Sequence, residues 1–261
     1  MNTETVPGTA AAQTAAGASA ETGSIASMTA PRSERRTRRG DASLTLLLAV
    51  QGLTLFVAIP LGAAHPAGRL LLDACHLAFA VTCIAALTQH HMVRGALLAG
   101  LALLAGAPAL AESLGAYLYI GADARYEVLA LLAFAFNGLV TVLVARHVFG
   151  PGRVTAHRVQ GAVLLYLNVA ALFAIAYGVL EAHAPGAITP TAGGTLPAAL
   201  GARIAALTYF SLTTITTTGY GDLAPLHPFA RSLANLESIF GQLFPATLLS
   251  RLIALHLAQG G

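Results

Sequence analysis

The segment of residues 213–222, TTITTTGYGD, contains residues that would let its backbone carbonyls bind a dehydrated cation. Replacing the water shell of a cation requires a series of carbonyl oxygens that all face one side of the chain. A backbone that alternates between ordinary and left-handed conformations presents its carbonyls in this way. Gly219 and Gly221 alternate with larger residues, and glycine adopts a positive φ without a Cβ clash. Thr217 adds a hydroxyl oxygen at the inner end of the segment.

The composition of the chain is typical of an integral membrane protein. Hydrophobic residues make up 56% of the 261 residues and charged residues only 10%, whereas soluble domains carry about 25% charged residues. The formal net charge of +3 needs no nucleic acid to explain it, because the excess arginine lies mainly at the predicted cytoplasmic ends of apolar segments. We therefore expect the chain to lie in a lipid bilayer and to have no nucleic acid partner.

Six apolar runs have close to the roughly 20 residues that an α-helix needs to cross a bilayer. The pattern predicts an all-α membrane protein with six transmembrane helices. Residues 1–40 contain no apolar run and are rich in Ala, Thr, Gly and Ser, which predicts a disordered cytoplasmic tail. The first run begins at Leu44 and continues for about 18 residues, and the others cover residues 70–87, 96–114, 127–149, 159–180 and 229–257.

The cation-binding segment is expected to follow a short re-entrant helix between the fifth and sixth runs. Residues 181–201 are rich in Pro, Gly and Thr, and the apolar residues 202–216 come next. A helix over 202–216 is too short to cross the bilayer, so it must enter and return on one side. We expect residues 41–150 to form a four-helix transmembrane domain and residues 151–261 to form a pore domain.

The placement of the arginines predicts the orientation of the chain in the membrane. If the odd-numbered spans run outward, one side carries a basic cluster within residues 32–39 and five further arginines, and the other side carries four arginines. The richer side is expected to be cytoplasmic, which places both termini inside the plasma membrane and the cation-binding segment near the outer surface. The five further arginines on the richer side are Arg94, Arg146, Arg153, Arg158 and Arg251. The four arginines on the other side are Arg69, Arg125, Arg203 and Arg231.

Residues 209–257 resemble the pore module of tetrameric potassium channels, and the whole chain resembles bacterial six-transmembrane members of that family with a single pore loop. The resemblance implies a homotetramer that conducts potassium passively. Thr218 departs from the Val or Ile that is usual after the inner-mouth threonine, but the backbone carbonyl binds the ion, so selectivity should survive. The implied selectivity filter consists of Thr217, Thr218, Gly219, Tyr220 and Gly221, with potassium at the first four.

The same resemblance implies residues that support the filter and a hinge in the last helix. Asp222 matches the acidic residue that follows the filter, and Tyr209 and Phe210 match two aromatic residues that brace it. Some family members have a carboxylate where this chain has Thr213, which implies that this filter is braced differently. In the last run, Gly241 matches a glycine hinge and Pro245 lies one turn beyond it, so the pair is expected to act as a gating hinge.

The fourth span departs from the voltage-gated members of that family. A voltage sensor needs several regularly spaced arginines in this span, because their movement through the field supplies the gating energy. Residues 127–149 are apolar around Asn137 and carry Arg146 only at their inner end. We therefore expect a channel that is not gated by an arginine ladder.

Several alternatives remain open on the sequence alone. A potassium transporter subunit usually has several filter-like loops, whereas this chain has one, and a weakly selective cation channel would share the same architecture. The chain shows no nucleophile–base pair, phosphate-binding loop or metal motif, so we expect neither an enzyme nor a cofactor. Glu237 lies within the last span, and either a structural hydrogen bond behind the filter or a pore-facing cation site would explain a carboxylate there.

Overall fold

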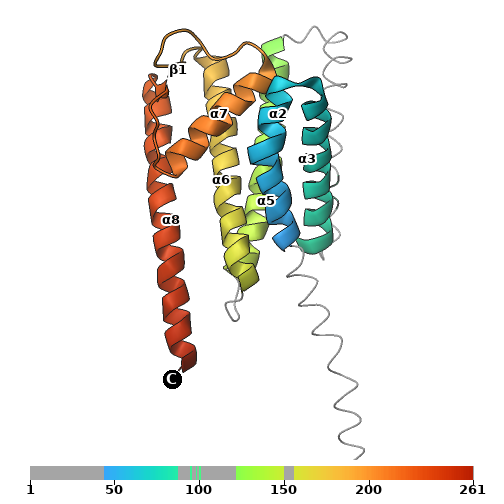
Figure 1. Ribbon diagram of the computed structural model, residues 1–261, viewed down its shortest axis with the longest axis vertical. Helices are drawn as coiled ribbons and strands as arrows, with labels where there is room; N and C mark the ends of the chain where they lie inside the picture. The colour runs from blue at the N-terminus through green and yellow to red at the C-terminus, as the bar shows by residue number, and fades with distance from the viewer. Residues whose placement is uncertain are drawn as a thin grey trace, which may run out of the picture. The chain divides into compact units, whose positions relative to one another are not determined.

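The computed structural model describes residues 44–87, 122–149 and 156–260, together with positions 95, 98 and 100. The chain divides into two units, Met1–Asp41 and Ala42–Gly261, and all described residues belong to the second. Within them the structure is mainly helical, and its only strands are two short ones (Figure 1). The predicted tail 1–40 and most of the predicted third span 96–114 lie outside the described residues.

The first described helix covers Leu44–Ala64 and changes its hydrogen-bonding pattern along its length. It contains a π-helical turn, η1 (Thr54–Ala58), and ends as α2 (Ile59–Ala64). His65 is extended, with φ −140° and ψ 144°, and α3 (Pro66–Leu87) begins at the proline that follows. A Cβ atom on Gly68 would overlap the backbone of Leu61, so the absence of a side chain allows α3 to pack closely against α2.

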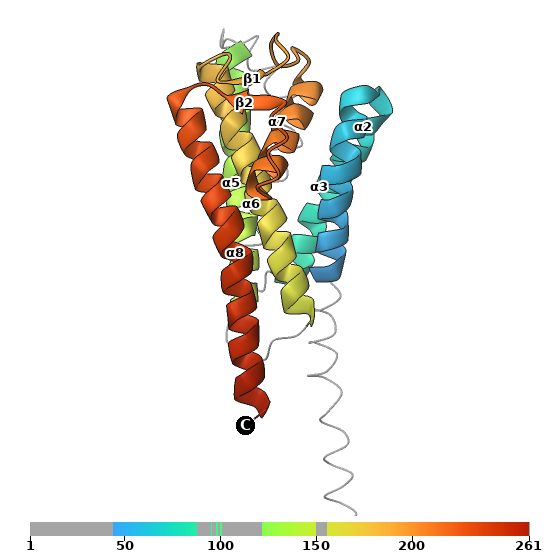
Figure 2. The same cartoon turned by 60° about the vertical axis from the view of Figure 1, so that its left-hand side comes forward.

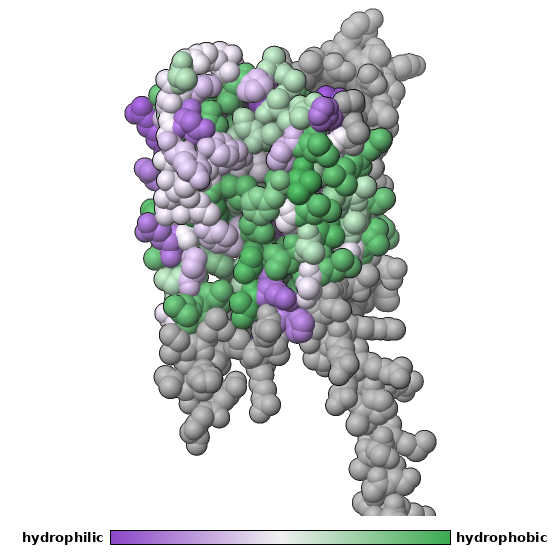
Figure 3. Space-filling model, viewed as in Figure 1, coloured by the Kyte–Doolittle hydropathy of each residue, from purple (hydrophilic) through white to green (hydrophobic). Residues whose placement is uncertain are grey.

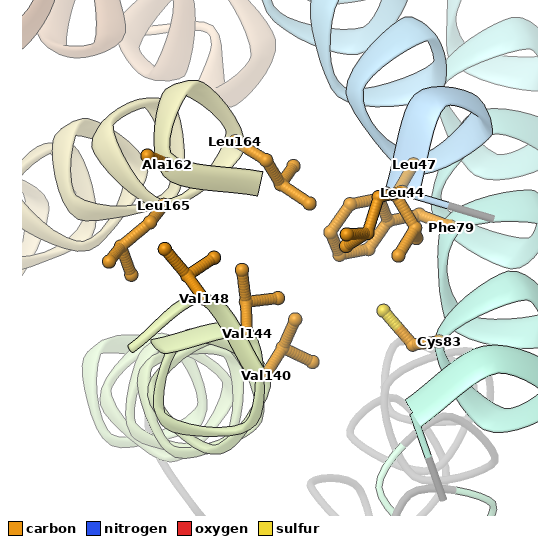
Figure 4. Packing of buried hydrophobic residues seen from close by; sticks show 10 residues of the cluster. All are labelled: Leu44, Leu47, Phe79, Cys83, Val140, Val144, Val148, Ala162, Leu164 and Leu165. Carbon is orange, nitrogen blue, oxygen red and sulfur yellow. The ribbon is translucent and has the colours of Figure 1, made fainter. Parts of the chain in front are cut away.

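A hydrophobic core joins the first helix and α3 to α5 (Ala122–Val148) and α6 (Ala156–His183). Val140, Val144 and Val148 recur every four residues on α5, so they lie on one face of that helix and share this core with residues of the other three helices (Figure 4). The core crosses the predicted boundary between residues 150 and 151, because its α6 residues lie in the predicted pore domain. The complete cluster is Leu44, Leu47, Phe79, Cys83, Val140, Val144, Val148, Ala162, Leu164 and Leu165.

The region after α6 contains a small sheet and two further helices. Strand β1 (Ile188–Pro190) pairs antiparallel with β2 (Leu223–Pro225), and α7 (Leu200–Ile215) lies between the two strands in sequence. Helix α8 (Pro228–Gly260) follows β2 after two residues. Helix α7 contacts both α6 and α8, and the turned view in Figure 2 shows α7 beside α6, with the sheet toward the upper end of these helices.

The described helices coincide with the predicted runs, apart from the third run, most of which lies outside the described residues. Helices cover all or nearly all of the first, second, fourth, fifth and sixth runs, and α7 begins two residues before the predicted short helix and ends one residue earlier. Two described helices, Leu44–Ala64 and His157–His183, are long and apolar enough to cross a membrane. On the face seen in Figure 3, hydrophobic residues cover a broad area and the most hydrophilic residues lie toward its edges.

The sheet of β1 and β2 was not predicted. Each strand has three residues and ends in a proline, so neither shows the alternating pattern by which a half-buried strand is found in a sequence. The sheet joins the loop before α7 to the residues that follow the cation-binding segment. Backbone pairing with β1 therefore holds the residues that directly follow the segment.

Candidate ion-binding segment

Helix α7 ends in a Schellman motif that leads directly into the predicted filter. The amide of Thr217 donates to the carbonyl of Thr214 at 2.9 Å, and the amide of Thr218 donates to the carbonyl of Thr213 at 2.8 Å. These are the two bonds of that motif, which needs a left-handed residue just after the helix cap. Thr217 occupies this position with φ 56°. The motif therefore fixes the direction in which the segment leaves the helix.

Every second residue of the predicted filter has a positive φ. The values are 56° at Thr217, 54° at Gly219 and 78° at Gly221. A positive φ was predicted at both glycines, and a Cβ atom on either would meet nothing within 4 Å, so the backbone conformation alone requires glycine there. At Thr217 it was not predicted, because a β-branched residue rarely adopts a left-handed conformation. Such an outlier costs about 1–3 kcal/mol and is typical of functional segments.

The carbonyl groups of this segment differ in their hydrogen bonding. Among the residues that the structure describes, none donates a hydrogen bond to the carbonyl oxygens of residues 217–220. The next carbonyl, that of Gly221, accepts a bond of 2.9 Å from the Thr191 hydroxyl, and the Thr191 amide donates to the carbonyl of Asp222 at 2.9 Å. The carbonyl of Thr216 likewise has no protein donor among the described residues, so the four residues predicted to bind potassium supply the last four of five such carbonyls. Thr191, in the loop before α7, therefore holds the outer end of the predicted filter in place.

The carbonyls at the end of α7 are all occupied by protein donors. The Tyr166 hydroxyl on α6 donates to the carbonyl of Ile215 at 2.7 Å. The carbonyl of Thr213 accepts bonds from the amides of both Thr218 and Gly219. The last carbonyls of a helix have no partner within the helix, so these bonds anchor the helix end to α6 and to the segment. Thr213 supports the segment through its backbone oxygen.

The two aromatic residues predicted to brace the filter lie in different places. The rings of Tyr209 and Tyr220 stack with centroids 6.2 Å apart and planes within 1° of parallel, so Tyr209 contacts the predicted filter. Phe210 is buried and meets the Tyr177 ring edge-on at 5.0 Å. It packs α7 against α6, and within the chain its ring has no described contact with the filter rings.

Glu237 is fully buried between α6, α7 and α8. Its carboxyl group accepts a bond of 2.7 Å from the Tyr177 hydroxyl and lies within hydrogen-bonding distance of the Ser211 hydroxyl. Its exposed fraction is 0%, so within a single chain the carboxyl group faces protein. Of the two explanations left open by the sequence, the structure favours the hydrogen bond. Its partner on α7 is a serine.

Gly241 and Pro245, the predicted hinge, lie within one continuous helix, α8. Proline has no amide hydrogen, so the carbonyl of Gly241, four residues earlier, lacks its usual helical donor. A Cβ atom on Gly241 would overlap the carbonyl oxygen of Ile215. Gly241 therefore has a packing role that the sequence did not show. The hinge itself stays a prediction.

Sequence reasoning missed the residues that bond to α7 and to the predicted filter from outside. Tyr166 and Tyr177 are 11 residues apart on α6, which is close to three helical turns. They therefore lie on one face, and two tyrosines on one face of an apolar helix were a usable signal for a polar partner. Thr191 gave no such signal, because it lies in a loop with many small polar residues.

Comparison with known families gives one match. A family model described as an ion channel matches residues 199–256, which cover α7, the predicted filter, β2 and most of α8. No curated protein and no solved structure matches the chain. Together with the apolar helices, the match indicates a membrane protein. The match therefore supports an ion channel, with residues 199–256 as the part that resembles the family.

Proposed function

We propose that the chain forms a potassium-selective channel whose filter is residues 217–221. The observation that carries the proposal is the run of consecutive carbonyls, residues 216–220, to which no described residue donates, in a backbone with a positive φ at Thr217, Gly219 and Gly221. A potassium filter needs these properties, because carbonyl oxygens replace the hydration shell of the ion. The carboxyl end of α7, with its partial negative charge, would favour a cation beneath the filter.

The working unit in this proposal is a homotetramer. One chain supplies one wall of carbonyls, and a ring around an axis requires symmetric copies. Tyr220 is 72% exposed in the single chain. Leu236, Ile239 and Leu243 are exposed on α8 and are spaced by three and four residues, so they share one helix face. These surfaces would be covered by neighbouring subunits.

The selectivity test compares potassium and sodium fluxes. Purified protein is reconstituted into liposomes with an outward gradient of either ion, and uptake of a tracer through the protein is measured. We expect strong uptake with potassium and little with sodium. Comparable uptake of both ions would refute the potassium selectivity and favour a weakly selective cation channel. Cross-linking of the reconstituted protein tests the tetramer separately.

The placement in the membrane is part of the same proposal. Both termini would lie in the cytoplasm, with the filter near the outer face of the plasma membrane, because the arginine-rich ends of the spans lie inside. Single cysteines introduced at position 2 and at position 192, within a variant lacking Cys75 and Cys83, provide the test. A membrane-impermeant thiol reagent applied to intact cells should label position 192 and leave position 2 unlabelled. The reverse labelling would contradict the orientation.

A further inference from the structure

A cluster of oxygen atoms behind the filter joins the three helices around it. Oε2 of Glu237 lies 2.7 Å from the Tyr177 hydroxyl oxygen, and Oε1 lies within hydrogen-bonding distance of the Ser211 Oγ. The same Ser211 Oγ lies 2.7 Å from the carbonyl oxygen of Ala170 on α6. Glu237 and Ser211 are each 0% exposed. We call these three side chains and the Ala170 carbonyl the Glu237 cluster.

The three oxygen–oxygen contacts of this cluster require three protons. A hydroxyl group has one proton to donate, and a backbone carbonyl has none. Tyr177 supplies one proton and Ser211 supplies another. If Glu237 were ionised, the cluster would have two protons for three contacts. Ser211 would then face two acceptors with one proton, and the remaining contact would set two lone pairs against each other.

We propose that Glu237 is held as a neutral carboxylic acid and that its proton positions α7 beneath the filter. In this arrangement Tyr177 donates to Oε2, the acid proton on Oε1 donates to Ser211, and Ser211 donates to the carbonyl of Ala170. Each of the three contacts then carries one proton. No bond is made or broken, and the proton stays within the cluster.

Burial supports the neutral form independently of the proton count. Removing an ionised carboxylate from water is costly unless a cation or several strong donors compensate for it. The hydrogen-bond partners of Glu237 in the described part of the chain are two neutral hydroxyl groups. A neutral acid avoids this cost, because it donates one hydrogen bond and accepts another.

The place of Ser211 in α7 links this proton to ion conduction. Ser211 lies two residues before Thr213, whose carbonyl receives the amides of Thr218 and Gly219. The Glu237 cluster therefore ties α6 and α8 to the helix turn that carries the start of the filter. This positioning role rests on the proposed function, whereas the protonation of Glu237 does not.

Infrared spectroscopy tests the protonation on the purified protein at neutral pH. The spectrum of the Glu237→Gln variant is subtracted from that of the wild type, which removes the contributions of all other carboxyl groups. We expect the difference to contain the carbonyl stretch of a protonated carboxylic acid. A difference that contains carboxylate stretches instead would overturn the proposal.

The positioning role is tested by potassium flux in the same liposomes. Glutamine keeps the donor and acceptor pattern of a neutral acid, since its amide donates to Ser211 and its carbonyl accepts from Tyr177. We expect Glu237→Gln to keep potassium flux and selectivity, and Glu237→Ala to lose the flux. Full flux in Glu237→Ala, or loss of flux in a correctly folded Glu237→Gln, would overturn the role. A wild type without potassium flux would refute the proposed function and leave the infrared result standing.

Discussion

Gly241 on α8 and Ile215 at the end of α7 approach so closely that a Cβ atom on Gly241 would overlap the Ile215 carbonyl oxygen. The same oxygen accepts the hydrogen bond from Tyr166 on α6. Three helices therefore meet at one carbonyl group, two residues before the proposed filter begins. Helix α8 can approach this carbonyl because Gly241 has no side chain. Helix α7 is held to α6 by the hydrogen bond from Tyr166.

Gly241→Ala should destabilise the protein, because the added methyl group must push α7 and α8 apart. Overpacking of this kind costs about 1–3 kcal/mol. The measurement is thermal unfolding in detergent together with potassium flux, and we expect both to fall. Gly138→Ala is the matched control, since Gly138 also lies within a helix and a Cβ atom there meets nothing within 4 Å. Equal stability of the two variants would contradict the close approach.

Pro245→Ala tests the predicted hinge without disturbing that contact. Alanine restores an amide that can donate to the carbonyl of Gly241, so the helical ladder becomes continuous and α8 becomes stiffer. We expect a changed open probability in single-channel recordings and an unchanged ratio of potassium to sodium permeability. A hinge at this position would be excluded by a variant whose open and closed times equal those of the wild type.

Thr191→Val should weaken the outer end of the filter. Valine has nearly the shape of threonine but cannot donate to the Gly221 carbonyl, and the loss of such a bond costs about 1 kcal/mol. We expect a lower single-channel conductance or less stable currents. Thr189→Val is the control, because the Thr189 hydroxyl donates only to the nearby carbonyl of Gly186. The role of Thr191 would be disproved if both variants conducted like the wild type.

The features that the sequence predicted correctly are those that depend on local properties. Apolar runs of sufficient length became helices, because burial of an apolar face and internal backbone pairing apply to each run separately. The positive φ values of Gly219 and Gly221 were likewise predictable from residue type. The depth of Glu237 in its span was enough to show that this carboxyl group needs protein partners or water.

The features that the sequence did not reveal depend on contacts between distant residues. Tyr177 precedes Glu237 by 60 residues, and no local pattern pairs them. Thr217 adopts a positive φ because the end of α7 forms a Schellman motif, in which glycine is the usual residue. The close approach of Gly241 to Ile215 could be seen only once α7 was placed beside α8. The resemblance to a hinge glycine predicted a role in bending and gave no sign of this packing role.

The open probability should depend weakly on membrane voltage. The arginines of α5 are Arg125 and Arg146, near its two ends, and Asn137 between them donates to the carbonyl of Ala133. A charge that crosses the field contributes about 2.3 kcal/mol per 100 mV, and α5 has no ladder of such charges. Recordings over a range of voltages provide the test. A steep curve equivalent to several gating charges per channel would contradict the expectation.

Gly221→Ala should abolish potassium conduction although the side chain has room. No atom lies within 4 Å of a Cβ at this position, but φ is 78°, and a left-handed alanine costs about 1–2 kcal/mol. The segment is expected to relieve this strain by turning a carbonyl away from the ion path. Gly194→Ala is the matched control, with φ 94° and equal room in the loop before α7. Potassium flux into liposomes should persist in Gly194→Ala and vanish in Gly221→Ala, and similar flux in both would show that the backbone at Gly221 does not hold the filter.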